Sequence, residues 1–432
     1  MNIQKLLYQN VFWRGLFYLS AFILNILIAR HFEAALTGWV YYIFNIYSFV
    51  TLIFSFSLEA GMVYFASKKE ISLSKLFSFS VIWVCLVAVV IMICFIWISH
   101  FTKNIRFVTF QFAFLFVCGN ILLSFLTSLF YAQQKYIAPN VTGICINVFL
   151  MFILLSLNEN RPWINNDVFI YIYFGSFLIQ AILLAAFMMR KLPKPLQFSL
   201  PDKPHLQILF RYCMLAFIAN FITFLLYRID YWFVNRYCTL EQLGNYIQVS
   251  KMAQMFFILP GILASTVFPL TAGDGSNQIK NSLMVLSRSL LFFYAIACGI
   301  LAITGRWLFP FIFGKSFAGM YIPFLLIIPG ILALSTLYTL TAYFSGKNRI
   351  SVNLKGSLIA VIFIISGDAF LIPKYGINAA AAVTSIGYII YHIYVLSIFI
   401  KEHKTPVIDF FYFKFSDLQR MKRSITKNIK IV

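Results

Sequence analysis

A cation and an anion lie two residues apart, at Arg228 and Asp230, in an apolar run that begins near Phe210. A charged side chain at a bilayer centre costs about 2.5–3.5 kcal/mol on insertion scales, so such a pair needs a partner or a function. Two locations suit the pair. Either it lies at the membrane–water boundary, where the aromatic residues 231–233 would form an interfacial belt, or it faces a polar cavity and contacts a solute that crosses the membrane.

Further ionisable residues lie in or beside apolar runs, and cations outnumber anions there. A guanidinium offers a planar fork of donors and an ammonium a compact charge, so this excess suits a solute that carries a diphosphate. The candidates for binding that solute are Arg228, Lys251, Arg14 and Arg30. The candidates for coupling to a cation or for gating are Asp230, Glu59 and Asp368.

For some of these residues a simpler explanation needs no transported solute. Glu59 could pair with Lys68 near the cytoplasmic end of its helix, and Asp368 could be solvated near the outer end of its helix. Lys251 lies eight residues into its helix, which is too deep for easy snorkelling to the surface. Sequence alone therefore leaves open which charges face a cavity.

The composition identifies the environment of these residues. The 432 residues are 61% hydrophobic and only 11% charged, whereas a soluble domain carries about 25% charged residues. The formal charge of +21 comes from basic residues in short segments between apolar runs, a pattern typical of membrane topology and of contact with anionic lipids rather than of nucleic-acid binding. We expect an integral membrane protein.

Motifs for metal, cofactor and nucleotide chemistry are absent from the sequence. Its seven cysteines form no CxxC pair and no Cys/His cluster, so we expect no metal site and no cofactor. There is no Walker A, HExxH or GxSxG pattern, so we expect a protein that is not an enzyme. The first apolar run ends at Arg30 without a small-residue cleavage site, which favours a membrane span over a cleaved signal.

Apolar runs of about 20 residues, the length of a transmembrane helix, recur along the chain. They are too long for the strands of a barrel, so the predicted fold is an all-α helical bundle. Twelve spans are expected, near 12–30, 39–66, 76–98, 107–132, 138–157, 168–188, 208–234, 243–270, 283–303, 320–344, 352–371 and 378–400.

The distribution of Lys and Arg predicts the orientation. With the N-terminus inside, the inner segments hold 24 of the 34 basic residues and the outer segments nine, with Lys251 inside a span. The positive-inside rule therefore places both termini in the cytoplasm. The residues after 400 form a basic tail that either lies on the inner leaflet as an amphipathic segment or is partly disordered.

The two halves of the chain resemble each other. The segment Arg30–Gly38 recurs in form as Arg236–Gly244, and Tyr131–Lys135 recurs as Tyr343–Lys347. Six spans precede the proline-rich loop and six follow it, so the repeats would be parallel, related by an axis along the membrane normal. The expected domains are an N-terminal six-helix lobe at 1–192, a cytoplasmic linker at 193–207, a C-terminal six-helix lobe at 208–400 and a tail at 401–432.

Four short segments, taken together, carry a resemblance to a known family. They are Ile28–Gly38 with Leu58–Gly61, Tyr227–Asp230 with Gly244–Tyr246, Phe313–Phe317, and Leu371–Ala382. In their order and spacing they resemble the bacterial polysaccharide biosynthesis proteins, which are lipid-linked oligosaccharide (O-antigen type) flippases of the multidrug/oligosaccharidyl-lipid/polysaccharide exporter superfamily. The chain departs from the family at Asn378, where glycine is frequent, and at 158–167, which has no clear family pattern.

The resemblance implies two lobes around a central cavity that work by alternating access. The implied substrate is an undecaprenyl-pyrophosphate-linked oligosaccharide, moved across the bacterial inner membrane for surface polysaccharide assembly. The implied partners are this substrate, anionic membrane lipids and a glycan polymerase or chain-length regulator, with no nucleic acid. Two alternatives stay open: a cation-coupled exporter of small molecules, and a membrane-embedded glycan polymerase or ligase, which the short outer loops disfavour.

Overall fold

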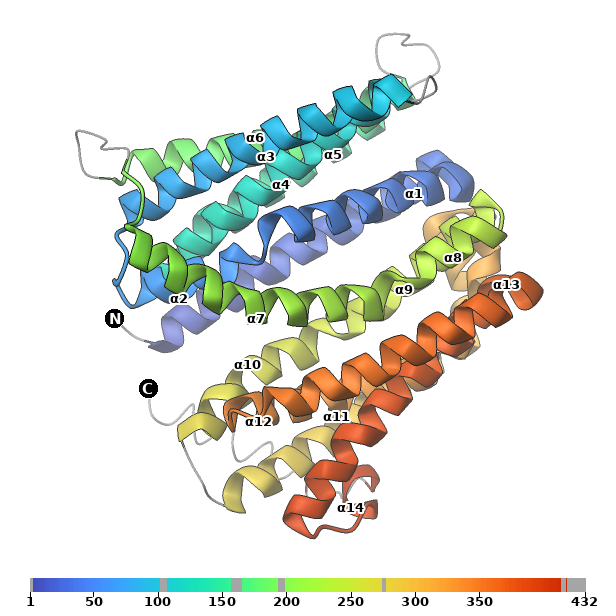
Figure 1. The fold of residues 1–432 in the computed structure, drawn as a ribbon. Coiled ribbons are helices and arrows are strands. Elements are labelled where there is room, and N and C mark those ends of the chain that lie inside the picture. Colours follow the sequence, from blue (N-terminus) through green and yellow to red (C-terminus); the bar gives the residue numbers. More distant parts are fainter. Residues whose placement is uncertain are drawn as a thin grey trace. The chain divides into compact units, whose positions relative to one another are not determined.

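The fold consists of helices, as the computed structural model in Figure 1 shows. The structure describes residues 3–101, 107–156, 165–192, 199–273, 277–412 and 417. Within these ranges the secondary structure comprises α-helices and one 3-10 helix, without a strand. The predicted all-helical fold is confirmed.

Two compact units divide the chain. Unit 1 is Met1–Phe32 with Val40–Phe221, and unit 2 is Glu33–Trp39 with Ile222–Val432. Helices α1 and α7 run through both units. The first seven helices are α1 (Ile3–Ser55), α2 (Leu58–Ser67), α3 (Leu73–Phe101), α4 (Phe107–Ala132), α5 (Ile137–Ser156), α6 (Asn166–Met189) and α7 (Lys203–Arg228).

The remaining helices belong to unit 2. They are α8 (Asp230–Tyr237), α9 (Leu240–Phe256), α10 (Ile258–Gly273), α11 (Asn277–Phe313), the 3-10 helix η1 (Lys315–Met320), α12 (Tyr321–Gly346), α13 (Ile350–His403) and α14 (Ile408–Phe411). The division between the units falls within α7. The domain boundary expected at 193–207 stays a prediction, and residues 193–198 lie outside the described ranges.

Ten helical runs in the described residues are long and apolar enough to cross a membrane. Two of them are far longer than one crossing needs, Gln9–Ser55 with 47 residues and Ile350–His403 with 54. Each contains one residue with left-handed φ, Glu33 at 56° and Gly376 at 61°, where the chain reverses (Figure 1). Counting each folded run as two crossings gives the twelve spans that the sequence predicts.

The reversal in α13 makes its two arms pack against each other. A Cβ on Gly387 would lie 2.5 Å from Ile364, and one on Gly367 would lie 2.7 Å from Val383. Such close approach of two helices requires residues without side chains at the contact. The turn itself uses Gly376, because other residues adopt its positive φ only with strain.

Three predicted spans are broken into two helices each. The span at 39–66 breaks at Phe56 and Ser57, both with left-handed φ near 50°. The span at 208–234 breaks at Ile229, and that at 243–270 breaks at Phe257, three residues before Pro260. A proline in the first turn of a helix costs no hydrogen bond, whereas one in the interior removes a hydrogen bond and clashes with the preceding turn, so a new helix that begins at Ile258 accommodates Pro260.

The tail beyond 400 is anchored on unit 2 where it is described. Helix α13 continues to His403, and Lys280 donates a hydrogen bond to the His403 carbonyl at 2.9 Å. Arg288 forms a buried ion pair with Asp417 at 2.9 Å and also donates to the Asp409 carbonyl at 3.1 Å. The expected amphipathic segment at 413–432 otherwise lies outside the described residues.

Candidate functional site

Two opposite charges, Arg228 and Asp230, lie on either side of the junction between α7 and α8 and have different surroundings. Helix α7 ends at Arg228, and α8 starts at Asp230 after the single residue Ile229. The Asp230 carboxylate lies at the start of α8, where backbone N–H groups point toward it, and its Oδ1 accepts a hydrogen bond from the Tyr231 N–H at 2.9 Å. Both charged residues lie in the described part of the chain, and no ion pair joins them there.

Asp230 is buried against α9 and α13, with 2% of its surface exposed. Its Oδ2 accepts hydrogen bonds from the Tyr246 hydroxyl and from the Thr384 hydroxyl, the latter at 3.2 Å. The two hydroxyls also lie 3.3 Å apart. Three segments distant in sequence therefore hold this carboxylate in one orientation.

A second carboxylate completes a cluster with the first. Asp368, on the first arm of α13, is fully buried, and neither of its oxygens has a hydrogen-bond partner among the described residues. It lies close enough to Asp230 and Tyr246 for their charges to interact. We name Asp230, Asp368, Tyr246 and Thr384 the carboxylate cluster.

The chemistry of the carboxylate cluster is that of a cation site. Two neighbouring carboxylates in an apolar interior cannot both stay charged unless a cation lies with them. The available atoms are all oxygens, which suit a proton or a hard cation such as Na⁺. Within the described residues there is no group of three or more His, Cys, Asp or Glu that could hold a metal ion.

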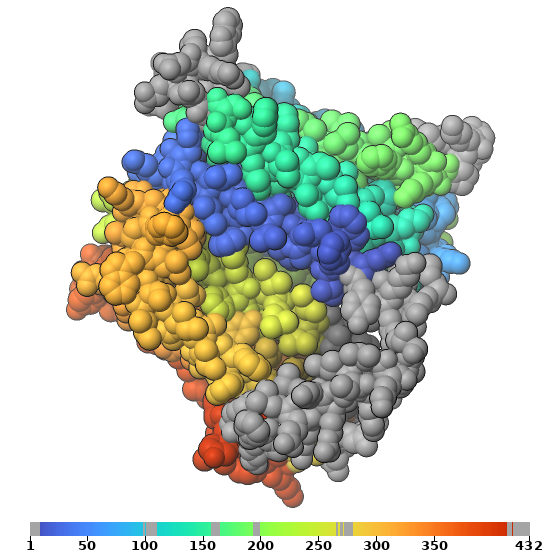
Figure 2. Space-filling view, turned by 180° about the vertical axis from the view of Figure 1, so that it is seen from behind, coloured from blue at the N-terminus to red at the C-terminus, as the bar shows by residue number. Residues whose placement is uncertain are grey.

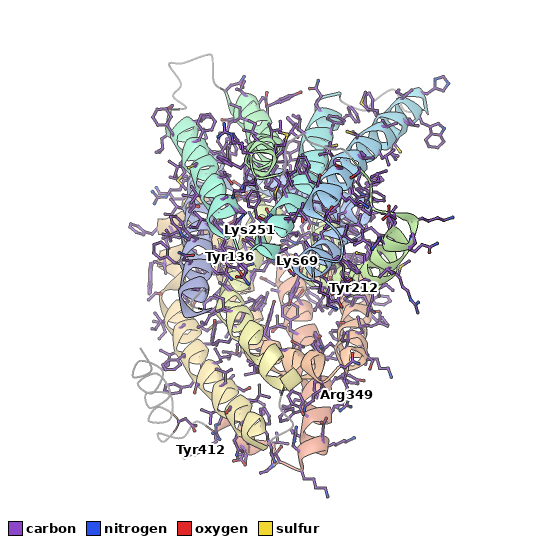
Figure 3. All side chains as sticks on the ribbon, turned by 90° about the vertical axis from the view of Figure 1, so that its left-hand side faces the viewer. Lys69, Tyr136, Tyr212, Lys251, Arg349 and Tyr412 are labelled. Carbon is purple, nitrogen blue, oxygen red and sulfur yellow. The ribbon has the colours of Figure 1, made fainter. Side chains whose placement is uncertain are left out.

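Arg228 points toward a second, cationic surface. Its guanidinium donates to the Gln254 side chain at 3.4 Å and lies 5.8 Å from the centre of the Tyr231 ring. Lys251, one turn before Gln254 on α9 and labelled in Figure 3, lies close enough to interact with the Arg228 charge. Two cations held together at membrane depth attract an anion.

The other predicted site residues lie in unit 1. Glu59 is in the first turn of α2 with a buried Oε2 that has no hydrogen-bond partner among the described residues. Lys68 pairs with Glu70 at 3.7 Å instead of with Glu59. Arg14 is exposed and lies 5.6 Å from the centre of the Tyr131 ring, and Arg30 is exposed near the end of the first arm of α1.

The structure thus groups the predicted residues of unit 2 in two sets, Asp230 with Asp368 and Arg228 with Lys251. Sequence reasoning missed Tyr246 and Thr384 as ligands of the carboxylate. Tyr246 stands in the repeated segment after Gly244, so its position carried a signal. Thr384 follows a run of alanines on α13, and no local pattern sets it apart.

Comparisons with known proteins give the fold. No family model matches the chain, and no curated protein matches its sequence. Among solved structures, the chain is similar to the lipid II flippase MurJ in an inward closed conformation, with a TM-score of 0.70 and 16% identity over 93% of this chain and 89% of that one.

Two transporters of the MATE family are also similar. An inward-facing multidrug resistance MATE transporter of the MOP superfamily has a TM-score of 0.70 and 8% identity, over 90% of this chain and 96% of that one. A eukaryotic MATE transporter has a TM-score of 0.63 and 13% identity, over 92% and 95%. These neighbours are one flippase and two transporters. The chain has the two-lobed helical membrane fold that this flippase and these transporters share.

Proposed function

We propose that this protein is a flippase that moves an undecaprenyl-pyrophosphate-linked oligosaccharide across the bacterial inner membrane for surface polysaccharide assembly, and that a cation bound at the carboxylate cluster is coupled to the movement. One observation carries the proposal. Arg228, which belongs to the cationic surface, and Asp230, which belongs to the cation site, flank the same one-residue helix break at Ile229.

The cationic surface matches the substrate end of this proposal. A pyrophosphate presents several anionic oxygens, and the Arg228 fork and the Lys251 ammonium supply donors of complementary charge. The lipid tail would stay in the bilayer while the charged group is held in the protein. Arg14 and Arg30 of unit 1 stay candidates for further contacts with the anion.

The carboxylate cluster matches the coupling end. With a cation bound, Asp230 and Asp368 attract it together and hold α8 against both arms of α13. Once the cation leaves, the two carboxylates repel each other and favour a conformation in which they separate. A ligand shifts a conformational equilibrium only through its different affinities for the two states, and this repulsion supplies that difference. Because Ile229 joins the two charges, such a shift also displaces Arg228.

Replacing the cations tests the substrate assignment. Arg228→Gln and Lys251→Gln should each lower translocation of a fluorescent polyprenyl-pyrophosphate-linked glycan in vesicles containing the purified protein, by about 10- to 100-fold for a lost charge-assisted contact. Arg236→Gln is the matched control, since Arg236 is an exposed cation at the far end of α8. The substrate assignment fails if both variants translocate the glycan at the rate of the control.

A cation-coupled exporter of small molecules is the second candidate. Similarity to two MATE transporters favours it, as does a buried carboxylate site that could serve any cation-coupled cargo. A strain that lacks the protein separates the candidates. Loss of surface glycan with unchanged drug susceptibility supports the flippase, whereas drug sensitivity with intact glycan supports the exporter.

The remaining features of the proposal follow from the flippase assignment. Both termini would lie in the cytoplasm, as the distribution of basic residues predicts. A glycan polymerase or chain-length regulator would receive the translocated unit on the other side. Anionic lipids would surround the basic inner segments.

A further inference from the structure

A groove on unit 1 lies apart from all the residues discussed so far. It is formed by α5, by α6 and by the start of α1, and it has a volume of about 990 Å³. Tyr136, which lines it, is labelled in Figure 3. Figure 2 shows the face on which α1 in blue, α5 in teal and α6 in green lie beside one another. We call this hollow the α5–α6 groove.

The walls of the α5–α6 groove are largely apolar and remain partly exposed. Exposed side chains line both walls, with exposed fractions of 44% for Ile137 and 50% for Phe149 on α5, and 42% for Leu183 and 40% for Phe187 on α6. In a membrane helix such side chains meet hydrocarbon. The groove is therefore a surface for an acyl chain rather than for a polar solute.

Other faces of α5 hold it in place, so the groove is a fixed feature of unit 1. Asn147 donates to the Ser20 hydroxyl of α1 at 2.9 Å, and Gln180 of α6 donates to the Pro139 carbonyl at 3.4 Å. A Cβ on Gly143 would lie 2.6 Å from the Phe17 ring, which shows how closely α5 and α1 approach. These contacts fix the spacing of the groove walls.

One end of the groove is cationic. Lys135 precedes α5 and Lys191 follows α6, so both lie where the helices leave the apolar layer. The Lys135 ammonium donates to Gln133 at 2.7 Å, and the Lys191 ammonium lies 4.9 Å from the centre of the Phe130 ring. Neither forms an ion pair with a described carboxylate. Desolvation and the charge of Lys135 lower the pKa of Lys191, so an anion between the two ammonium groups would relieve their repulsion.

We propose that the α5–α6 groove binds one anionic phospholipid, with its phosphate between Lys135 and Lys191 and an acyl chain along Phe149 and Leu183. We choose this class of ligand because an anionic phospholipid has a phosphate next to an apolar chain, just as the groove has two cations at headgroup depth next to apolar walls. None of the cations proposed to bind the pyrophosphate of the transported substrate (Arg228, Lys251, Arg14 and Arg30) lines the groove. We therefore treat the phospholipid as a resident ligand of unit 1 and not as the cargo, which the competition with undecaprenyl phosphate below tests.

Lipid binding to the full-length protein tests this site. The protein in detergent is titrated with phosphatidylglycerol and, separately, with phosphatidylcholine, and bound lipid is counted by native mass spectrometry. The double variant Lys135→Gln/Lys191→Gln should weaken phosphatidylglycerol binding by about 10- to 30-fold, since each surface cation contributes to anionic-lipid binding. Leu183→Trp, which fills the groove, should weaken binding without changing the charge.

A matched control removes the same charge elsewhere in unit 1. Lys68→Gln/Lys69→Gln lies in the turn between α2 and α3 and should retain the binding of the unaltered protein. A phosphatidylglycerol with a photoreactive acyl chain should crosslink to 137–156 and 166–189. The proposal is overturned if the two double variants bind alike, if the crosslinks fall outside these helices, or if undecaprenyl phosphate displaces phosphatidylglycerol from the groove at equal concentration.

Discussion

Units 1 and 2 each contain a helix that breaks beside a carboxylate, and the two breaks have different surroundings. In unit 1 the break at Phe56 and Ser57 precedes Glu59, and the Ser57 hydroxyl accepts a hydrogen bond from Asn220 at 3.0 Å. In unit 2 the break at Ile229 precedes Asp230, which is surrounded by two hydroxyls and a second carboxylate.

The difference shows how one helical plan serves two purposes. A break frees backbone groups that must find partners in a membrane. In unit 1 these partners are neutral: the Ser57 N–H donates to the Ser55 hydroxyl at 3.3 Å, and the Phe54 carbonyl accepts from the Trp83 indole at 2.8 Å. Unit 2 adds Asp368 beside Asp230, and under the proposed function the two carboxylates together bind the coupling cation. We therefore propose that coupling depends on the carboxylate cluster of unit 2 and not on Glu59.

The largest expected effect separates these two carboxylates. Asp230→Asn should reduce the rate of cation-dependent translocation, because an amide cannot share a cation with Asp368. The expected reduction is about 5- to 150-fold, the factor that a typical allosteric coupling free energy produces. Glu59→Gln should leave the rate unchanged. The measurement is translocation in vesicles, with and without a cation gradient.

A stability control and a contradicting outcome accompany that comparison. Both variants should keep the thermal unfolding midpoint of the unaltered protein within a few degrees, since asparagine and glutamine preserve the shape of the side chains they replace. Equal loss of translocation in both variants would contradict the assignment of coupling to unit 2 alone.

A smaller effect is expected where the repeated segments meet. Gly38 and Gly244 occupy matching places in the two repeats, and the structure brings them together within unit 2. A Cβ on Gly244 would lie 1.9 Å from the Ala34 carbonyl oxygen, and one on Gly38 would lie 2.6 Å from the Gly244 nitrogen. Backbone cannot move aside as a flexible side chain can. Gly244→Ala should therefore lower the free energy of unfolding by about 1–3 kcal/mol or more, and Gly38→Ala by a similar or smaller amount.

The helix interior of α11 offers the matched control. A Cβ on Gly299 would meet nothing within 4 Å. Gly299→Ala should be neutral or stabilise by up to about 1 kcal/mol, because alanine is the better helix former. Thermal unfolding in detergent measures all three variants. If Gly244→Ala and Gly299→Ala have the same unfolding midpoint, the close contact between the two repeated segments is not present.

Apolar length and charge placement predicted much of the fold. The twelve spans follow from runs of about 20 apolar residues. The cost of charge in a membrane singles out Arg228 and Asp230 as candidate site residues, which stays a prediction. The matching places of Gly38 and Gly244 were visible as a repeat, although their contact was not.

Local sequence could not show which charges meet in space. Asp230 and Asp368 are separated by most of unit 2, and their proximity depends on the packing of α8 against α13. The reversal of α13 at Gly376 brings Thr384, on the second arm, to the same carboxylate. Arg228 and Asp230, two residues apart in sequence, face different partners, Gln254 and Tyr246. Helix breaks and reversals are set by tertiary packing, so a hydropathy pattern reads across them as continuous spans.

The smallest effect is expected at the surface of unit 1, where an acidic residue stays in solvent. Asp202 precedes α7 and pairs with Lys75 of α3 at 3.1 Å, and the hydrogen bond and charge of Lys75 hold the pKa of Asp202 below its ordinary value. A carboxyl whose pKa is lowered by folding stabilises the fold above its unfolded pKa, and that stabilisation is lost as the pH falls through the folded pKa.

Asp202→Asn should thus lower the unfolding midpoint slightly, by about a degree or less, above about pH 5 and not below about pH 3. In a Lys75→Met background the same substitution should have a smaller effect above about pH 5, because only His205, 3.6 Å from the Asp202 carboxylate, still lies beside it. Salt at 1 M should reduce the difference further. An effect of undiminished size without Lys75 would show that Lys75 does not set the pKa of Asp202.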